Sequence, residues 1–179
     1  MLTTAAALRG ATKHYKTFAL GPVDLAVPAG SILGLIGENG AGKTTALKLL
    51  CGAIRPAGGS VELLGGSPAD PAIRARIGVV FEDAYFPDCF NAACVGKSMA
   101  GIFGKRWDTA IFDALVRRFE LDGSKKIKAY SRGRRMKLSL ATALAHDPEL
   151  LILDDATAGL DPVVRGELLD LQLDVLQDE

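Results

Sequence analysis

The sequence predicts an α/β fold with a mainly parallel sheet, an antiparallel β subdomain and an inserted α-helical subdomain. Three apolar runs have the length and composition of buried parallel strands; they occupy residues 31–36, 76–81 and 150–153. Strand-like segments separated by glycine and proline fill much of the N-terminal part. Residues from about 85 to 145 show helical periodicity between two strands that must pair, so we expect them to form a lobe inserted into the core.

The first apolar run leads into a glycine-rich loop. Residues 37–45 read Gly-Glu-Asn-Gly-Ala-Gly-Lys-Thr-Thr, with the spacing G-x-x-x-x-G-K-[ST]. Such a loop can turn its N–H groups towards a phosphate chain, and the helix that follows, residues 44–51, adds its positive N-terminus. Lys43 can reach the β- and γ-phosphates, and the Thr44 hydroxyl can ligate Mg²⁺. The pattern predicts a P-loop NTPase core; the alternative is a glycine-rich turn that happens to precede Lys-Thr.

Composition narrows the class of protein. With 179 residues, of which 49% are apolar and 23% charged, the chain suits one globular core. A net charge of +0 argues against nucleic acid as the main partner. We expect no membrane-spanning helix and no signal peptide, because no apolar run is long enough and the first residues lack a basic region. The cysteines have no zinc-site spacing, so we expect free thiols.

The N-terminal segments predict the antiparallel strands. Residues 11–15, 19–27 and 61–64 read as short strands bounded by glycine and proline. Tyr15 ends the first of them, and an aromatic ring near a phosphate loop can stack on an adenine. The other interpretation of Tyr15 is a half-buried strand residue.

Acidic residues end the two later apolar runs. Glu82 follows residues 76–81, and Asp154 and Asp155 follow residues 150–153. A carboxylate at the end of a buried strand is costly unless it meets a cation or a proton donor. Beside a phosphate loop, Asp154 therefore fits a Mg²⁺ ligand, and Asp155 fits a residue that orients or deprotonates water. The alternative is a pair of acids that caps the next turn.

The inserted lobe is predicted to contain three helices, over residues 91–103, 108–121 and from 131 to about 146. Asp108 and Ser131 are the expected N-caps. Ser131 with Gly133 at a helix start is also an anion-binding arrangement, although an ordinary cap explains the same residues. A last helix is predicted over residues 162–177, after an aspartate and a proline.

In this order the motifs resemble those of the ATPase subunit of an ATP-binding cassette (ABC) transporter, over essentially the whole chain. Residues 37–45 match the Walker A motif, and residues 150–155 match the Walker B motif. Residues 130–134, Tyr-Ser-Arg-Gly-Arg, stand where the family has its Leu-Ser-Gly-Gly-Gln signature. Residues 158–161 match the D-loop, and Tyr15 matches the adenine-stacking aromatic residue. The variant signature is similar to that of bacterial exporter cassettes.

The resemblance implies that the chain binds ATP with Mg²⁺ and hydrolyses the ATP. The implied nucleotide contacts are Tyr15, Gly37, Asn39, Gly40, Ala41, Gly42, Lys43, Thr44, Thr45, Ser131 and Gly133. The implied magnesium ligands are Thr44, Glu82 and Asp154, and the implied catalytic residues are Asp155, Lys43 and Glu82. Residues 1–179 are expected to form a single ABC ATPase domain that lacks its C-terminal end, with the helical subdomain at about 85–145.

The resemblance also implies partners. Two cassettes, identical or different, are expected to pair head to tail, with each nucleotide between one Walker A loop and the other cassette's signature. A transmembrane permease is expected to dock near residues 82–90, where Tyr85 and Phe86 are predicted to be exposed. This places the chain in the cytoplasm, peripheral on the inner face of the cell membrane. The permease, and not this chain, would set the transported substrate.

Three departures from the family pattern affect the expected activity. Glu82 stands in place of a glutamine, and Asp155 stands in place of the catalytic glutamate. Asp is one methylene shorter than Glu, and misplacement by about an ångström can lower a rate on the order of a hundredfold. The chain also ends at Glu179, before the family's switch histidine, as a truncated cassette would. We therefore expect slow hydrolysis and an exposed apolar sheet edge.

The leading interpretation is the ATPase of a membrane transporter, of the bacterial exporter type. Two others stay open. A soluble ABC ATPase could act on ribosomes or DNA, and a regulatory module could bind nucleotide without hydrolysing it, as Asp155 and the missing histidine suggest.

Overall fold

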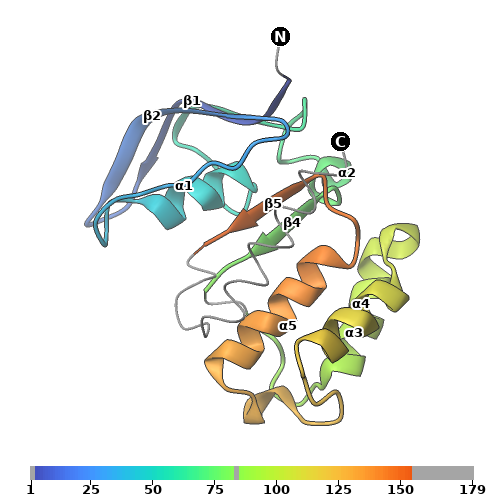
Figure 1. Cartoon of the computed structure of the whole chain (residues 1–179). Helices are drawn as coiled ribbons and strands as arrows, with labels where there is room; N and C mark the ends of the chain where they lie inside the picture. Colours follow the sequence, from blue (N-terminus) through green and yellow to red (C-terminus); the bar gives the residue numbers. More distant parts are fainter. Residues whose placement is uncertain (1–2, 83–84, 155–179) are drawn as a thin grey trace. The chain divides into compact units, whose positions relative to one another are not determined.

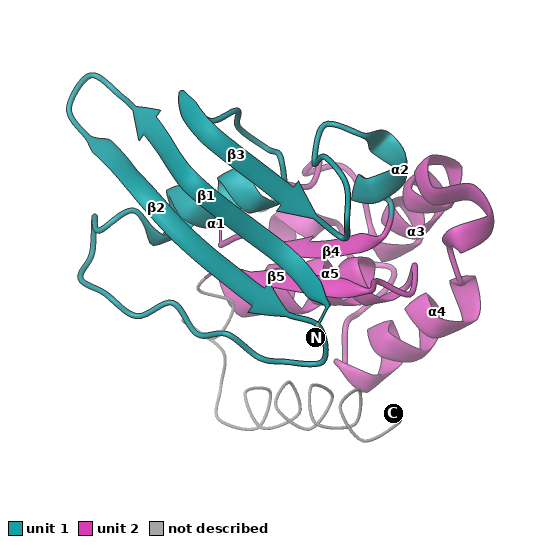
Figure 2. Cartoon of the chain, turned by 90° about the horizontal axis from the view of Figure 1, so that it is seen from above, with its two compact units in different colours: residues 1–75 teal, residues 76–179 magenta. Residues whose placement is uncertain are grey.

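The computed structural model of the chain describes residues 3–82 and 85–154 (Figure 1). The chain divides into two units, which Figure 2 shows in different colours: unit 1 is Met1–Ala75 and unit 2 is Arg76–Glu179. The predicted D-loop at residues 158–161, the predicted last helix and Asp155 lie outside the described residues. None of the described helices combines the length and the apolar character needed to cross a membrane.

Unit 1 is built on a three-stranded antiparallel sheet in the order β2-β1-β3, with the strands β1 (Thr4–His14), β2 (Ala19–Pro28) and β3 (Gly58–Leu63). The central strand β1 is the most buried, because both its edges are paired. Helix α1 (Lys43–Leu50) contacts β1 and β3 and lies on one face of the sheet (Figure 2). Leu49 and Leu50 of α1 are buried and join the helix to the sheet.

The strands predicted at 19–27 and 61–64 are confirmed, and the first strand is longer than predicted. It begins at Thr4, whereas residues 11–15 were expected. Gly10, with φ +55°, lies where the register between β1 and β2 shifts. Its N–H donates to Asp24 Oδ1 at 2.7 Å. The glycine therefore forms a bulge within the strand and does not end it.

A short helix, α2 (Pro71–Arg74), is absent from the sequence prediction. Asp70 is its N-cap, and the Asp70 carboxylate accepts from the Ala72 N–H at 2.8 Å. An aspartate followed by a proline is the same start signal that predicts the helix at residues 162–177, so the sequence contained the information.

The prediction of a buried parallel strand at residues 31–36 is wrong. These residues form no strand, Ile36 is 99% exposed and Ile32 is 59% exposed. An apolar run specifies a preference for burial, whereas a parallel strand also needs the backbone of a neighbouring strand as its hydrogen-bond partner. The described sheet of unit 1 is antiparallel, and residues 31–36 pair with none of its strands.

Unit 2 contains a pair of parallel strands, β4 (Ile77–Val80) and β5 (Leu150–Leu153). The segment between them holds α3 (Ala92–Phe103), η1 (Gly104–Arg106), α4 (Thr109–Arg118), η2 (Ile127–Ala129) and α5 (Arg132–Leu144) (Figure 1). The three predicted helices are confirmed, and side chains cap all three: Asn91 caps α3, Asp108 caps α4 and Ser131 caps α5.

Helix α5 connects the helices of unit 2 to its strands. It contacts α3, α4 and β4, and its buried face joins a core with the side chains of Phe112, Phe119 and Ile127. A Cβ at Gly78 of β4 would lie 2.7 Å from the Ala143 carbonyl oxygen, so α5 lies directly on the strand. This close contact fixes where α5 lies relative to the end of β4.

Candidate functional site

The glycine-rich loop of unit 1 is a tight turn that leads directly into α1. Gly40 and Gly42 have φ of +84° and +96°, conformations that favour glycine. The Ala41 N–H donates to the Glu38 carbonyl oxygen at 3.2 Å. Gly42 is the N-cap of α1, and no side chain in the described part of the chain caps this helix. The positive end of α1 therefore faces the loop, as an anion-binding site requires.

The other predicted residues of this loop lie at its surface or at the first turn of α1. The exposed ones are Gly37, Asn39, Gly40, Ala41 and Thr44, and Thr45 is half-buried. The loop itself is therefore open to a solute.

Lys43 bonds to carbonyl groups of its own loop. Its Nζ donates to the oxygens of Gly37 and Glu38, at 2.7 and 2.9 Å. An ammonium forms stronger hydrogen bonds with charged acceptors than with neutral carbonyls. Lys43 can therefore exchange these two bonds for phosphate oxygens while α1 stays in place.

Tyr15 lies beside a second aromatic residue, Phe18, which the sequence analysis missed. The two ring centroids are 6.4 Å apart with an interplanar angle of 29°, and the Tyr15 N–H donates to the Phe18 carbonyl oxygen at 2.7 Å. A Cβ at Gly42 would lie 2.9 Å from Phe18 Cζ, so Phe18 touches the glycine loop as well. Tyr15 itself is 48% exposed, which leaves ring surface on which a base could stack. The sequence did contain a signal for Phe18: it is an aromatic residue three positions after Tyr15, at the other end of the turn that Tyr15 begins.

The carboxylates of unit 2 follow two adjacent strand ends. Val80 of β4 pairs with Leu153 of β5, so Glu82 and Asp154 come after the same edge of the parallel pair. Asp154 is only 8% exposed, and its N–H donates to the Val80 carbonyl oxygen at 2.8 Å. A buried carboxylate at this edge suits a cation as its partner. The Glu82 carboxylate accepts a hydrogen bond from Arg132 of α5.

Ser131 caps α5 as expected. Its Oγ accepts from the Arg134 N–H at 3.3 Å, and the side chain is exposed, as the start of a helix beside a ligand would be. The preceding residue, Tyr130, is buried, and its hydroxyl donates to the Asp122 carbonyl oxygen at 2.7 Å. Burial raises the pKa of Tyr130, so the phenol stays a donor. This bond anchors the start of α5, with Ser131 and Gly133 just after it.

Two further predictions concern the segment after β4. Tyr85 is 82% exposed, which confirms the expectation for this residue. Phe86 was expected to be exposed as well, and this is wrong: it is 9% exposed and belongs to the core of unit 2. Neighbouring apolar residues in an irregular segment point in different directions, and hydropathy alone does not say which one turns inward.

Among the described residues, no three His, Cys, Asp or Glu side chains gather into a metal site. Magnesium is usually held through one or two carboxylates and substrate phosphates and seldom by a cage made of protein alone. The donors predicted here, a threonine hydroxyl and two carboxylates, are all oxygen atoms and fit that chemistry.

Comparison with known proteins identifies the family of the chain. A family model described as ABC transporter matches residues 20–158. The daunorubicin resistance ATP-binding protein DrrA3 of Streptomyces coeruleorubidus is 37% identical over an alignment of 181 positions, gaps included, which covers 95% of this chain and 56% of that protein. The Nod factor export ATP-binding protein I of Cupriavidus pinatubonensis is 39% identical over 174 residues, with coverage of 92% and 53%. The chain thus spans about half the length of these relatives.

Solved structures share the fold. An ATP-binding subunit of an ABC transporter has a TM-score of 0.84 at 25% identity, covering 98% of this chain and 75% of its own. A dimeric ATP-binding cassette in a post-hydrolysis state, bound to ADP and Pi, also has a TM-score of 0.84, at 22% identity and with coverage of 97% and 83%. The predicted α/β fold with a P-loop NTPase core is therefore confirmed. With the glycine loop, the acidic strand ends and the family match in agreement, the chain belongs to the ATP-binding domains of ABC transporters.

Proposed function

We propose that this chain binds and hydrolyses ATP to power a membrane transporter of the exporter type. The observation that carries the proposal is the glycine loop of unit 1, where the positive end of α1 and the Lys43 ammonium meet at one exposed turn. The names of the relatives point to export, since they include drug resistance and Nod factor export.

In the proposed mechanism, each part of unit 1 binds one part of ATP. The adenine stacks on Tyr15, whose position relative to the loop is set by Phe18. The phosphates accept hydrogen bonds from the loop and α1, and Lys43 turns from the carbonyls of Gly37 and Glu38 to the β- and γ-phosphates. Asn39, Ala41 and Thr45 are the other residues of the loop and of α1 that contact the phosphates in this proposal.

Thr44, Asp154 and Glu82 would hold magnesium. When bound, Mg²⁺ neutralises charge on the β- and γ-phosphate oxygens. Of the three, Asp154 is a buried residue at a strand end, where a carboxylate favours a cation as its partner. Asp155 orients the attacking water, and its short side chain makes hydrolysis slow. That same feature favours a second candidate function, a module that binds ATP and rarely hydrolyses it.

Two protein partners follow from this assignment. A second cassette pairs head to tail with this one, so that Ser131 and Gly133 contact the γ-phosphate bound to the partner. A permease docks on the segment after β4, where Tyr85 offers an exposed aromatic ring. The chain then works in the cytoplasm, on the inner face of the membrane, as one ABC ATPase domain with a helical subdomain at about 85–145.

Calorimetry with Mg-ATP on the whole chain tests the proposal. Lys43→Ala should weaken binding about ten- to hundredfold, because hydrogen bonds to charged groups contribute about 1.5–3 kcal/mol. Lys97→Ala is the matched control, since it removes the same charge from an exposed position on α3. Absence of binding heat in the unmodified chain, or equal affinities for the two variants, would contradict the proposal.

A further inference from the structure

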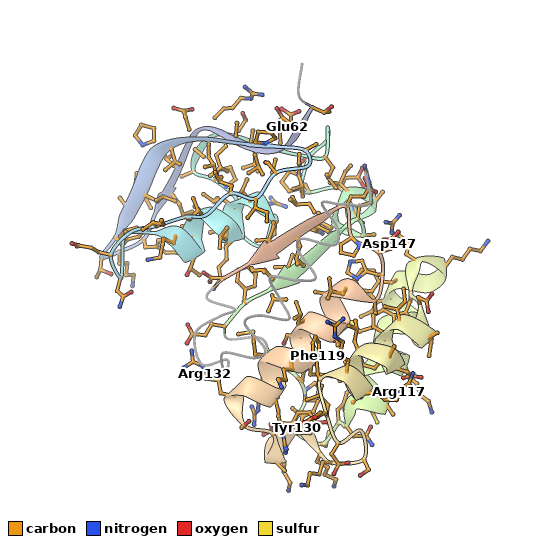
Figure 3. The ribbon with its side chains drawn as sticks, viewed as in Figure 1. Glu62, Arg117, Phe119, Tyr130, Arg132 and Asp147 are labelled. Carbon is orange, nitrogen blue, oxygen red and sulfur yellow. The ribbon has the colours of Figure 1, made fainter. Side chains whose placement is uncertain are left out.

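An ion pair joins the segment after β4 to the start of α5. The Arg132 guanidinium bonds to Glu82 Oε1 across 50 positions of sequence. Arg132 lies at the first turn of α5 (Figure 3), and Glu82 lies two residues beyond the end of β4. These are two of the positions at which the chain departs from the family pattern, which has glutamine and glycine there. The two departures therefore meet in one contact.

The contact engages the carboxylate that the proposed function assigns to Mg²⁺. Arginine carries a permanent charge, so the guanidinium is a constant partner for the Glu82 carboxylate. A competing cation for Glu82 or a competing anion for Arg132 can separate the pair. Among the described residues at this helix start, Arg135 instead contacts Asp88 Oδ1, at 3.9 Å. Arg132 is therefore the arginine of α5 that holds Glu82.

Solvent reaches both partners, which sets the strength of the contact. The side chains of Arg132 and Glu82 are 59% and 46% exposed. Exposed ion pairs are weak and are screened by salt. A pair of this kind contributes little to the stability of the fold, but it is weak enough to open when either partner finds a phosphate or a metal.

We propose that Arg132 is a positioning residue that competes with magnesium for the Glu82 carboxylate until a phosphate draws the guanidinium away. The proposal rests on the proposed function, in which Glu82 serves the nucleotide on its own glycine loop and the start of α5 contacts the nucleotide on the partner cassette. When the γ-phosphate of the nucleotide on the partner cassette binds Arg132, Glu82 is released. Glu82 can then bind the magnesium of the nucleotide on its own glycine loop. The ion pair thus couples the two nucleotides of the dimer.

The test measures the Mg²⁺ dependence of ATP binding by calorimetry, using the whole chain and the variants Arg132→Gln, Glu82→Gln and the double variant. Arg132→Gln should tighten Mg-ATP binding roughly twofold to fivefold, the range of an exposed ion pair. Binding of ATP in EDTA should not tighten, because Glu82 then has no metal to reach. In the Glu82→Gln background, Arg132→Gln should have no effect on Mg-ATP binding.

Controls separate the ion pair from a general effect of charge. Arg117→Gln removes the same charge from an exposed position on α4 (Figure 3) and should leave the Mg²⁺ dependence unchanged. Arg132→Lys should keep most of the wild-type behaviour, since it keeps the charge. If Arg132→Gln tightens binding equally with and without Glu82, or changes nothing, the inference is overturned.

A second readout needs no nucleotide. In urea unfolding, Glu82→Gln and Arg132→Gln should be non-additive, and the charge swap Glu82→Arg with Arg132→Glu should recover part of the lost stability. Additive effects would overturn the ion pair itself. A chain that binds no Mg-ATP in any variant would overturn the proposed function, and the inference with it, whereas normal ATP binding with an inert Arg132 overturns the inference alone.

Discussion

At Gly42, backbone conformation and neighbouring side chains both exclude a larger residue. Its φ is +96°, and a Cβ there would lie 2.6 Å from Leu20 Cδ1 and 2.9 Å from Phe18 Cζ. Gly40, two residues earlier, has a similar φ of +84°, but among the described residues no atom beyond its chain neighbours lies within 4 Å of the Cβ position. A substitution at Gly40 therefore tests backbone strain alone, whereas a substitution at Gly42 tests strain together with crowding by side chains.

We predict that Gly40→Ala lowers the free energy of unfolding by about 1–2 kcal/mol, through strain at positive φ alone. Gly42→Ala should lower it by at least about 1 kcal/mol more, because Phe18 and Leu20 must move. Urea unfolding followed by circular dichroism measures both. Equal losses for the two variants would show that the contact between Phe18 and the loop does not restrict residue 42.

Residue-level features of this loop were predictable because the motif is contiguous. The spacing of Gly37, Gly42 and Lys43 specifies its chemistry within a few positions of sequence. The contact between Phe18 and Gly42 depends on how β1 and β2 turn above the loop, and no local pattern contains that distance. The pairing of Arg132 with Glu82 was hidden for the same reason, since the two residues are 50 positions apart.

Among the helices, α4 and α5 start with different caps. Asp108 Oδ1 accepts from the N–H groups of Ala110 and Ile111, at 2.8 and 3.0 Å. Ser131 Oγ accepts from one N–H, that of Arg134, at 3.3 Å. The longer single bond makes Ser131 the weaker cap, and the proposed function gives this serine a second role.

Asp108→Ala and Ser131→Ala test that second role. Each should lower the free energy of unfolding by about 0.5–2 kcal/mol, with the larger loss for Asp108→Ala. Only Ser131→Ala should weaken ATP-dependent association of two cassettes, which light scattering measures. If Asp108→Ala weakens association as much as Ser131→Ala does, the effect is one of stability and the proposed contact with the second nucleotide is wrong.

The helices and most strands could be predicted because their signals are local. Asn91, Asp108 and Ser131 are caps that precede apolar periodicity, and such a signal does not depend on the rest of the chain. The prediction of a strand at residues 31–36 was wrong because an apolar run does not identify the strand that would pair with it. The prediction that Phe86 is exposed was wrong because the irregular segment after β4 has no periodicity that would show which side chains face inward.

Across unit 2 as a whole, one acidic residue links the starts of both parallel strands. Glu149, just before β5, bonds to Arg76 through both carboxylate oxygens, at 2.7 and 2.6 Å. Arg106 of η1 approaches Glu149 at 3.8 Å and donates to the carbonyl oxygen of Asp147 (labelled in Figure 3). The cluster thus joins the two strands and the helical segment. The hydrogen bond from Arg76, and then the nearby charges of Arg76 and Arg106, lower the pKa of Glu149.

A carboxyl group whose pKa is lowered in the folded state stabilises the fold above its unfolded pKa, about 4.3 for glutamate, and loses that effect as the pH falls through the folded pKa. We predict that Glu149→Gln unfolds at a lower urea concentration than the unmodified chain at pH 7. The difference should shrink below about pH 4 and in high salt, since both side chains are partly exposed. Asp113→Asn, an exposed carboxylate on α4, is the control. A difference that is unchanged at acidic pH would exclude this ion pair as its origin.

The parallel pairing of β4 with β5 has a consequence for how the chain acquires its structure. All the helices from α3 to α5 are translated between the two strands, so β4 leaves the ribosome well before its neighbour exists. Contacts between distant parts of the sequence form late, because a long segment must first be brought together. Until β5 arrives, Ile77 and Val80 belong to a strand whose parallel partner has not yet been made. Nascent chains arrested before Leu150 are therefore the ones that most need a chaperone.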